Sequence, residues 1–328
     1  MNVLIVGAGA VGLVYGHHLA KAGHNVTFLV KEKYHKDLEK ERKKGIVLYQ
    51  LNNDKQLQSP IRFNNYSVIS NWQHANDFDL VTLSISSTAL RQLPLTPIKE
   101  IMFRSNKAAS LLMLQPSEED LNYLSQVIPQ KNILQGMITL ISYQTDNINE
   151  GISPAGTAYY LPPLAMPISA TKLAQKKNNL KETVAVFKES GINAKVVNSA
   201  LDESRLISAF LMTFLCALEA ANWRFKHLKQ STILLKLLSE AQRDLLPQKI
   251  LGIGLFPTIK RSLLKRLLKP WLYKALIRLA PIIVPLPLEA YLKKHFLKVR
   301  PQTLMYMQNY QDRHPSIPVA NLVALISD

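Results

Sequence analysis

The feature that most constrains this chain is a glycine pattern near its start, VGAGAVG over residues 6–12. An apolar run typical of a buried strand stops at Gly7, and Gly7, Gly9 and Gly12 give the spacing G-x-G-x-x-G. A helical pattern follows, and then a second strand pattern over 25–30. In such a unit the glycines permit the tight turn, the approach of a pyrophosphate and close packing of the helix on the strand. We therefore expect a dinucleotide to bind through the loop residues Gly7, Ala8, Gly9, Ala10, Val11 and Gly12; the alternative is a steric turn with nothing bound.

The residues after the second strand indicate which dinucleotide binds. A ribose 2′-hydroxyl is usually held there by Asp or Glu, whereas a 2′-phosphate favours a cation. Lys31 comes first after the strand and Lys33 follows, with Glu32 between them. We expect NADP rather than NAD, with Lys31 at the 2′-phosphate. The alternative is that both lysines simply begin the charged stretch over 31–44.

Composition narrows the class of protein. The chain has 328 residues, 47% of them hydrophobic, which suits two domains with sizeable cores. No apolar run approaches the length of a membrane span, and the apolar start is better explained by the glycine loop than by a signal peptide. A single cysteine, Cys216, excludes an internal disulfide and cysteine-cluster metal sites. We expect a cytoplasmic protein.

The charged and histidine residues point to acidic partners and away from metals. A formal net charge of +17 favours phosphorylated cofactors, nucleic acid or anionic lipid, but no nucleic-acid-binding motif accompanies it. The eight histidines show no metal-ligand spacing. His17 and His18 lie on the first helix, where we expect surface or packing residues rather than ligands.

The rest of the chain divides into two patterns. Up to about residue 200, strands alternate with helices, which favours a doubly wound parallel sheet. The strand patterns cover 46–50, 60–65, 79–86, 110–115 and 132–144, and a helix is expected at 117–128, capped by Ser117. Residues 158–169, a helix at 180–191 and residues 193–198 complete this domain. Beyond residue 200 helices dominate, beginning with a long one over 201–223 that Ser199 is expected to cap. We therefore expect domains at 1–199 and 200–328.

These residues carry a resemblance to a known family. The opening NVLIVGAGAVGLVYGHHLAKAGHNVTFLVK closely resembles the start of ketopantoate reductases (2-dehydropantoate 2-reductases), and DLVTLSIS, SLLMLQ, QGMITLISYQ and PAGTAYYLP continue the order. The C-terminal stretches YLKKHFLKVRPQTL and IPVANLVALI look like a divergent branch. The resemblance implies an NADP-binding Rossmann-type domain followed by a mostly helical substrate or dimerisation domain. It also implies reduction of a 2-oxo acid or related ketone by hydride transfer from NADPH.

Two family positions near the cofactor are altered. After the third core strand the family usually reads Val-Lys-Ala, and the match here is Ile85-Ser86-Ser87, so the lysine is absent. After Leu-Gln the family has Asn-Gly, and this chain has Pro116 and Ser117. A proline supplies neither a side-chain amide nor a backbone donor.

The largest departure lies on the long helix. The family's catalytic lysine and two asparagines on one helix face correspond to Arg205, Ala209 and Thr213. Arg205 is the candidate catalytic cation, although an arginine is a poor general acid; its alternative is a surface ion pair with Asp202 or Glu203. Glu219 is a conceivable replacement acid, or a solvated carboxylate at a helix end.

The late substrate-binding residues of the family also match poorly. Thr303 is a candidate for the family's serine, and no residue matches its glutamate. Tyr306, Asn309 and Asp312 recur at helical spacing, where packing is the expected role. These losses leave a second hypothesis open beside the reductase, namely a dinucleotide-binding sensor or scaffold.

One further segment invites an interaction. Residues 257–300 hold eleven Lys or Arg residues against one acid, Glu289, and two rows of apolar residues recur along them every four positions. This pattern suits a peripheral contact with an anionic membrane, or a helix packed on its own domain with a solvated basic face; Pro270 would kink either version. A homodimer also remains open.

Overall fold

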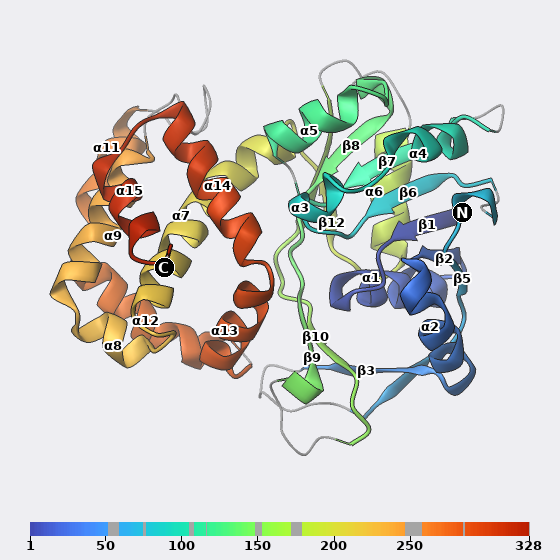
Figure 1. The fold of residues 1–328 in the computed structure, drawn as a ribbon, viewed down its shortest axis with the longest axis horizontal. Helices are drawn as coiled ribbons and strands as arrows, with labels where there is room; N and C mark the ends of the chain where they lie inside the picture. Colours follow the sequence, from blue (N-terminus) through green and yellow to red (C-terminus); the bar gives the residue numbers. More distant parts are fainter. Residues whose placement is uncertain are drawn as a thin grey trace. The chain divides into compact units, whose positions relative to one another are not determined.

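The computed structural model describes residues 1–51, 59–74, 77–104, 108–115, 117–147, 153–171, 179–246, 258–284 and 286–327. The chain splits into two compact units, one built from Met1–Asn52 and Gln56–Leu201, the other mainly from Asp202–Asp328. Figure 1 shows the first as a sheet with helices and the second as helices alone. Each unit is described by itself below.

The first unit is organised around an eight-stranded sheet with the order β12-β11-β8-β7-β6-β1-β2-β5. Its strands are β1 (Asn2–Val6), β2 (Asn25–Leu29), β5 (Ser67–Ile69), β6 (Leu80–Leu83), β7 (Ser110–Met113), β8 (Ile133–Gly136), β11 (Met166–Ala170) and β12 (Ala194–Val196). The six strands from β8 to β5 are parallel, whereas β11 pairs antiparallel with β8 and carries β12 with it. The expected doubly wound sheet is present, with a mixed edge that the strand patterns did not predict.

Helices cover both faces of this sheet because its inner strands are apolar on both sides. Val3 and Ile5 join the core beneath α1 (Ala10–Lys21) and α6 (Asn179–Glu189). Leu4 and Val6 join the core beneath the other helices, α3 (Ser87–Leu90), α4 (Leu95–Met102) and α5 (Glu118–Ser125). This arrangement is a Rossmann-like fold. Ser117 caps α5 as predicted, since its hydroxyl accepts the amide of Asp120 at 3.0 Å.

A second, four-stranded sheet lies over α1, as Figure 1 shows. Its order is β4-β3-β10-β9, from β4 (Ile61–Phe63), β3 (Ile46–Gln50), β10 (Thr157–Tyr160) and β9 (Ile141–Gln144), and α2 (Glu32–Lys44) precedes it in the chain. The prediction of one long strand over 132–144 was wrong. That segment forms β8 in the large sheet and β9 in the small one, because residues 137–140 leave the extended ladder between them.

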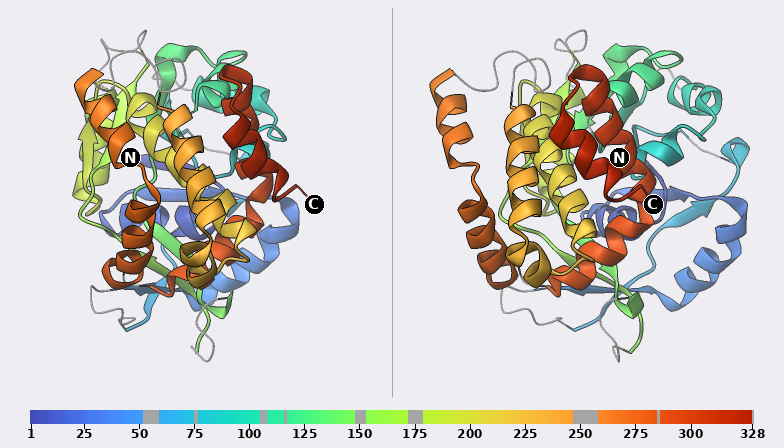
Figure 2. Two further views of the ribbon diagram at one scale, coloured as in Figure 1. Left: turned by 90° about the vertical axis from the view of Figure 1, so that its left-hand side faces the viewer. Right: turned by 60° about the vertical axis from the view of Figure 1, so that its left-hand side comes forward.

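The second unit is entirely helical in the part that the structure describes. It contains α7 (Ala200–Ala220), α8 (Phe225–Gln230), α9 (Thr232–Asp244), α11 (Thr258–Leu267), α12 (Pro270–Ile283), α13 (Leu288–Lys298), α14 (Arg300–Arg313) and α15 (Ile317–Ala324). Their shared core includes Leu215, Leu218, Leu235, Leu238, Met307 and Leu322. Figure 2 shows these helices from two further directions.

Pro270 differs from its predicted role. It is the first residue of α12 and separates that helix from α11, where the sequence suggested a kink within one helix. Proline has no backbone N–H, so it would interrupt the hydrogen bonds inside a helix but loses none at the first helical position. This explains why a new helix begins at Pro270. Among the described residues no single helix has the length and apolar character of a membrane span; only α12 and α13 taken together, bent by 101°, pass that test.

Candidate functional site

The candidate site lies where the parallel strands end. Val6 of β1 pairs with Leu29 of β2 on one side and with Leu83 of β6 on the other, so these three strands end level with one another. The chain leaves β1 toward β2 and later returns to the opposite side of β1 through β6. The order of strands therefore reverses between β1 and β6, which is where open α/β sheets bind ligands.

The glycine loop fills this switch point, and each glycine has its expected role. Gly7 has φ +99°, a conformation that favours glycine, and its amide donates to the carbonyl of Leu29 at 2.9 Å. A Cβ on Gly12 would lie 2.3 Å from the carbonyl oxygen of Gly7, so only glycine lets α1 approach the strand this closely. A Cβ on Gly9 would meet nothing within 4 Å. The space above Gly9 is therefore open to a ligand.

The N-terminus of α1 is suited to an anion. Gly9 is its N-cap and has no side chain to accept hydrogen bonds, and the first helical bond runs from the amide of Leu13 to the carbonyl of Gly9 at 2.9 Å. The amides of Ala10, Val11 and Gly12 precede that bond and have no acceptor within the helix. No acidic residue occupies the first turn. These donors and the positive end of the helix dipole fit a pyrophosphate.

A serine that the sequence did not single out holds the loop in place. Ser84 follows β6 directly, and its hydroxyl lies 2.8 Å from the carbonyl oxygen of Gly7 and 3.0 Å from that of Val6. Because a hydroxyl carries one proton, the two carbonyls share it. The same oxygen lies 2.7 Å from a Cβ built on Gly12. The only feature of the sequence that could have indicated this role is the position of Ser84, directly after a buried strand that neighbours β1.

The end of β2 places a cation and a carboxylate side by side. Lys31 is the N-cap of α2 and is exposed. The Glu32 carboxylate accepts a hydrogen bond from the hydroxyl of Ser70, the first residue after β5. The ammonium of Lys33 lies 4.8 Å from the ring centre of Tyr34. Lys31 is thus the cation that follows β2 most directly, while Glu32 is held toward Ser70.

Polar residues beyond β6 and β7 are bound to one another. The Ser87 hydroxyl lies 2.6 Å from Asp120 and 3.0 Å from the side-chain oxygen of Gln115, and Arg91 forms an ion pair with Asp120 at 2.7 Å. Asp120 is buried, and burial raises the pKa of its carboxyl while Ser87 and Arg91 act in the opposite direction. This network joins α3 to α5.

The family's lysine has no counterpart among residues 84–87. Residues 84–87 are Ser-Ile-Ser-Ser and contain no lysine. The Ser86 hydroxyl accepts the amide of Ala89 at 3.1 Å and so caps α3. Pro116 lies outside the described residues, so the prediction made for it has no structural counterpart.

Three of the positions considered on α7 lie in a buried or paired environment. Ala209 and Thr213 are fully buried, and the Thr213 hydroxyl lies 2.9 Å from the carbonyl of Ala209 and 3.0 Å from the amide nitrogen of Gln242. Glu219 is paired with Arg300 at 2.7 Å and is 17% exposed, so it is not the solvated carboxylate considered above. Thr213 and Glu219 therefore hold the helical unit together.

Arg205 is the remaining candidate on α7. It forms the ion pair with Asp202 that the sequence left open, at 3.2 Å, and its side chain is 18% exposed. It belongs to the second unit, whereas the glycine loop belongs to the first.

The late residues lie on α14 within the helical unit. Thr303 is buried, and Tyr306 packs against the core of the unit. Asn309 is half-buried, and the Asp312 carboxylate accepts a hydrogen bond from Gln308 at 2.8 Å. For Tyr306 and Asp312 these contacts agree with the packing roles expected of them.

The two histidines of α1 are packing residues and not surface residues. His18 Nδ1 lies 3.0 Å from the carbonyl of Ser190, and the rings of His17 and His18 meet those of Phe63 and Tyr159 edge-on. Burial lowers the pKa of His17 to about 4 and also lowers that of His18. Within the described residues no group of His, Cys, Asp or Glu is placed to hold a metal ion.

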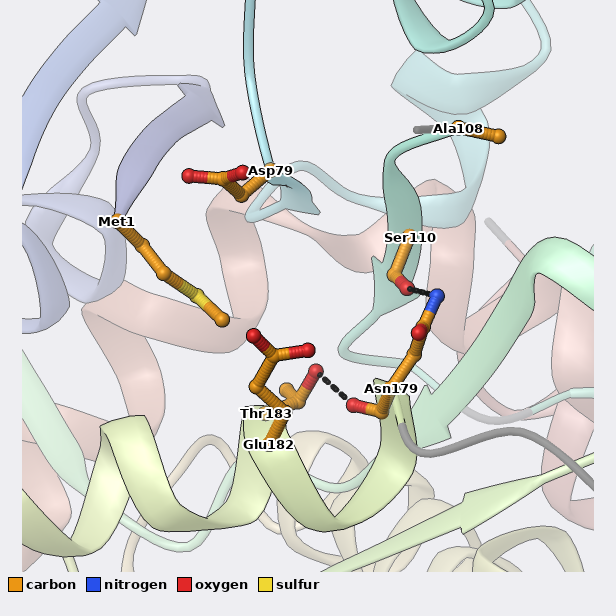
Figure 3. A pocket seen from close by; sticks show the side chains of 7 residues that line it. All are labelled: Met1, Asp79, Ala108, Ser110, Asn179, Glu182 and Thr183. Atoms are coloured by element: carbon orange, nitrogen blue, oxygen red, sulfur yellow. Dashed lines mark hydrogen bonds between the residues drawn. The ribbon is translucent and has the colours of Figure 1, made fainter. Parts of the chain in front are cut away.

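Two hollows in the first unit lie apart from the glycine loop. Figure 3 shows one at the other end of the strands, where Met1 and Asp79 precede β1 and β6. Its volume of about 10 Å³ suits a single water. The other, of about 230 Å³, has the lining Tyr15, Thr139, Leu140, Leu161, Pro162, Pro163, Leu164, Gly191, Ile192 and Asn193. Neither is large enough for a dinucleotide, and the larger has no charged lining residue to hold an acid.

Comparison with known proteins places the first unit in a family. Residues 3–151 match the family model described as ketopantoate reductase PanE/ApbA. They form a ketopantoate reductase domain. The resemblance predicted from the glycine loop and the following strands is thereby confirmed. The comparison with curated proteins gave no match.

Solved structures share the fold of the whole chain. D-mandelate dehydrogenase, solved with NADH and anilino(oxo)acetate, is 14% identical with a TM-score of 0.68, over 100% of this chain and 97% of that one. The 2-dehydropantoate 2-reductase of Geobacter metallireducens GS-15 is 16% identical with a TM-score of 0.65, over 100% and 99% of the chains. A probable 2-dehydropantoate 2-reductase of Bacillus subtilis is 15% identical with a TM-score of 0.64, over the same shares. The helical unit that follows the ketopantoate reductase domain is therefore also part of the fold that these structures share.

Proposed function

We propose that this protein is an NADP-dependent oxidoreductase that reduces a small 2-oxo acid or a related ketone. The observation that carries the proposal is the glycine loop at the switch point, with open space above Gly9 and the first-turn amides of α1 facing no intrahelical acceptor. A nicotinamide dinucleotide fits such a loop through its pyrophosphate. When bound, it supplies a hydride to the substrate.

The choice of NADP rests on the end of β2. Lys31 is exposed there, and Glu32, which would suit a ribose 2′-hydroxyl, accepts from Ser70. A 2′-phosphate beside Lys31 would gain a charge-assisted hydrogen bond. Among similar structures, D-mandelate dehydrogenase was solved with NADH, so this fold is compatible with NADH as well.

The substrate class rests on the ketopantoate reductase domain and on one similar structure. D-mandelate dehydrogenase was solved with anilino(oxo)acetate, a molecule with an oxo group beside a carboxylate. Addition of a hydride to such a ketone develops negative charge on its oxygen, which needs a nearby cation and then a proton. In this proposal Arg205 supplies the cation. Its guanidinium stays charged, so the proton comes from water or another donor.

A second candidate function is dinucleotide binding without efficient turnover. It is favoured by the absence of a lysine in residues 84–87. It is also favoured by the absence of a side-chain amide at two positions of α7, which are the buried residues Ala209 and Thr213. A positioned proton donor typically contributes about 10²–10⁴-fold in rate. We therefore expect very slow oxidation of NADPH with ketopantoate.

The experiment that separates the two functions is a time course of NADPH absorbance with ketopantoate and a panel of other 2-oxo acids. Turnover of any panel member that is lost in the Arg205→Ala variant supports the reductase. NADPH binding without turnover of any member supports the sensor or scaffold. Ketopantoate turnover of about one per second or faster, as in ordinary enzymes, would contradict the residue matches made for α7.

A further inference from the structure

The helical unit carries an apolar face that its own core does not cover. On α12 only Tyr273 and Ile277 are buried among the described residues of that helix. Five large apolar side chains of the same helix are 48–72% exposed, namely Trp271, Leu276, Leu279, Ile282 and Ile283. We call these five side chains the α12 face.

The α12 face covers the far side and one flank of the helix. At 100° per residue, Tyr273 and Ile277 point in nearly the same direction. Trp271, Leu279 and Ile282 point away from them, and Leu276 and Ile283 lie on one flank. The buried side is fixed, because the Tyr273 hydroxyl donates to the side-chain oxygen of Gln242 at 2.8 Å and α12 packs on α8 and α9. Figure 2 shows α12 at the outer edge of the helical unit.

The preceding helix also exposes apolar side chains, since Leu263 and Leu267 of α11 are 57% and 41% exposed. Isolated exposed leucines are ordinary in folded proteins, whereas five large apolar side chains exposed on one helix indicate an interaction site. The α12 face is therefore the candidate docking surface.

Cations lie beside the α12 face, and the segment that carries it has no acid. Lys274 and Arg278 are exposed beside the α12 face, and Lys265, Arg266 and Lys269 are exposed on and after α11. No Asp or Glu occurs between residues 245 and 288. Residues 202–328 hold nineteen Lys or Arg against eight Asp or Glu, so the excess positive charge is concentrated in the helical unit.

We propose that the α12 face and its flanking cations bind the surface of an anionic phospholipid bilayer. A Trp and aliphatic residues on one side of a helix with Lys and Arg at its border are the composition of helices that lie in the bilayer interface. Each cation near an anionic leaflet adds attraction, which salt screens.

Charge decides between a bilayer and a second copy of the chain. A two-fold interface brings the same patch of both copies together, and here each patch is bordered by cations with no acid in the segment. An anionic bilayer instead meets every one of those cations with an opposite charge. The proposal therefore commits to the lipid surface, and self-association becomes an outcome of the test.

The test is co-sedimentation of the full chain with vesicles of phosphatidylcholine alone or with phosphatidylserine, at low and at moderate salt. We expect binding to the anionic vesicles only, weaker at moderate salt. Trp271 is 56% exposed whereas Trp223 is buried and Trp72 half-buried, so a blue shift of fluorescence on binding that is absent in Trp271→Phe reports insertion of the α12 face.

Two matched pairs of substitutions locate the contact. Lys274→Glu with Arg278→Glu should lower the bound fraction at least tenfold, while Lys226→Glu with Lys229→Glu on α8 changes net charge equally and should lower it far less. Ile282→Ser with Ile283→Ser should abolish the fluorescence shift while circular dichroism stays unchanged.

Three outcomes would overturn the proposal. The first is no binding to anionic vesicles at low salt, and the second is an equal loss of binding in both charge pairs. The third is a dimer in solution that the Ile282→Ser and Ile283→Ser changes dissociate, since the α12 face would then be covered by a second copy.

Discussion

The hydroxyl of Ser84 lies 2.8 Å from the carbonyl oxygen of Gly7, across the point where the strand order of the large sheet reverses. The same hydroxyl is 3.0 Å from the carbonyl of Val6, so one side chain directly after β6 fixes the turn at the end of β1. The conformation of the glycine loop is therefore set by a neighbouring strand as well as by the glycines themselves.

Replacement of Ser84 tests this link. Ser84→Ala removes the donor shared by Gly7 and Val6, and loss of a hydrogen bond of this kind costs about 1 kcal/mol. We expect a destabilisation of that size in urea unfolding, together with weaker NADPH binding because the loop is less well fixed. A Ser125→Ala variant is the control for affinity, since the Ser125 hydroxyl donates to the carbonyl of Leu121 within α5. Equal effects of both changes on NADPH affinity would contradict a role for Ser84 in holding the loop.

Two glycines of the loop should separate packing from binding. Gly12→Ala places a Cβ 2.3 Å from the carbonyl oxygen of Gly7, and overpacking of this kind costs about 1–3 kcal/mol. Gly9→Ala meets nothing within 4 Å, so its stability should stay close to that of the wild type. Both variants should bind NADPH at least about tenfold more weakly, or 1.4 kcal/mol. Thermal unfolding and calorimetry measure the two quantities, and a Gly9→Ala variant with unchanged affinity would place the pyrophosphate elsewhere.

Acid should destabilise the protein through its buried histidines. Burial lowers the pKa of His17 to about 4 and also lowers that of His18, so the folded state binds fewer protons than the unfolded state between pH 6.5 and pH 4. Stability is unaffected by these groups above pH 6.5 and falls as the pH drops through that window, by up to about 1.4 kcal/mol per unit for each histidine. Unfolding of wild type and His17→Gln at pH 7 and pH 5 checks this. A pH dependence that is identical in the variant would show that His17 is not buried in its neutral form.

Replacing Arg205 of α7 by the family's lysine should not by itself restore turnover of ketopantoate. Arg205→Lys supplies a better proton donor, but Ala209 is fully buried and the Thr213 hydroxyl is bonded within the helix, so neither can help to orient a substrate. We expect turnover of ketopantoate to change by less than about tenfold. Steady-state kinetics measure it, and a gain of about 100-fold or more would show that this lysine alone was missing.

Much of the first unit follows from local patterns in the sequence. The loop glycines, β1, β2 and the cap of α5 by Ser117 each depend on neighbouring residues, and all were predictable. The division of 132–144 between two sheets was not, because an apolar alternating segment reads the same whichever strand it pairs with. The antiparallel β11 was missed for the same reason, since its direction is decided by pairing with β8.

In the candidate site too, features set by neighbouring residues were predictable, and contacts between residues far apart in the sequence were not. The sequence predicts the loop but not Ser84, because its partner Gly7 is 77 residues away. The pairing of Glu219 with Arg300 spans 81 residues and was equally invisible. The exposure of the α12 face was only half visible, since the sequence shows two apolar rows, whereas the fold buries Tyr273 and Ile277, which belong to neither row.

Calorimetric titration of NADPH and of NADH into the wild-type protein, repeated with Lys31→Ala and with Lys36→Ala as a matched exposed lysine, tests the central claim most directly. The account predicts one site that prefers NADPH by at least about tenfold, or 1.4 kcal/mol, a preference lost in Lys31→Ala and kept in Lys36→Ala. Failure to bind either dinucleotide would contradict the assignment of the glycine loop. Equal affinities for the two cofactors, or no loss in Lys31→Ala, would contradict the choice of NADP.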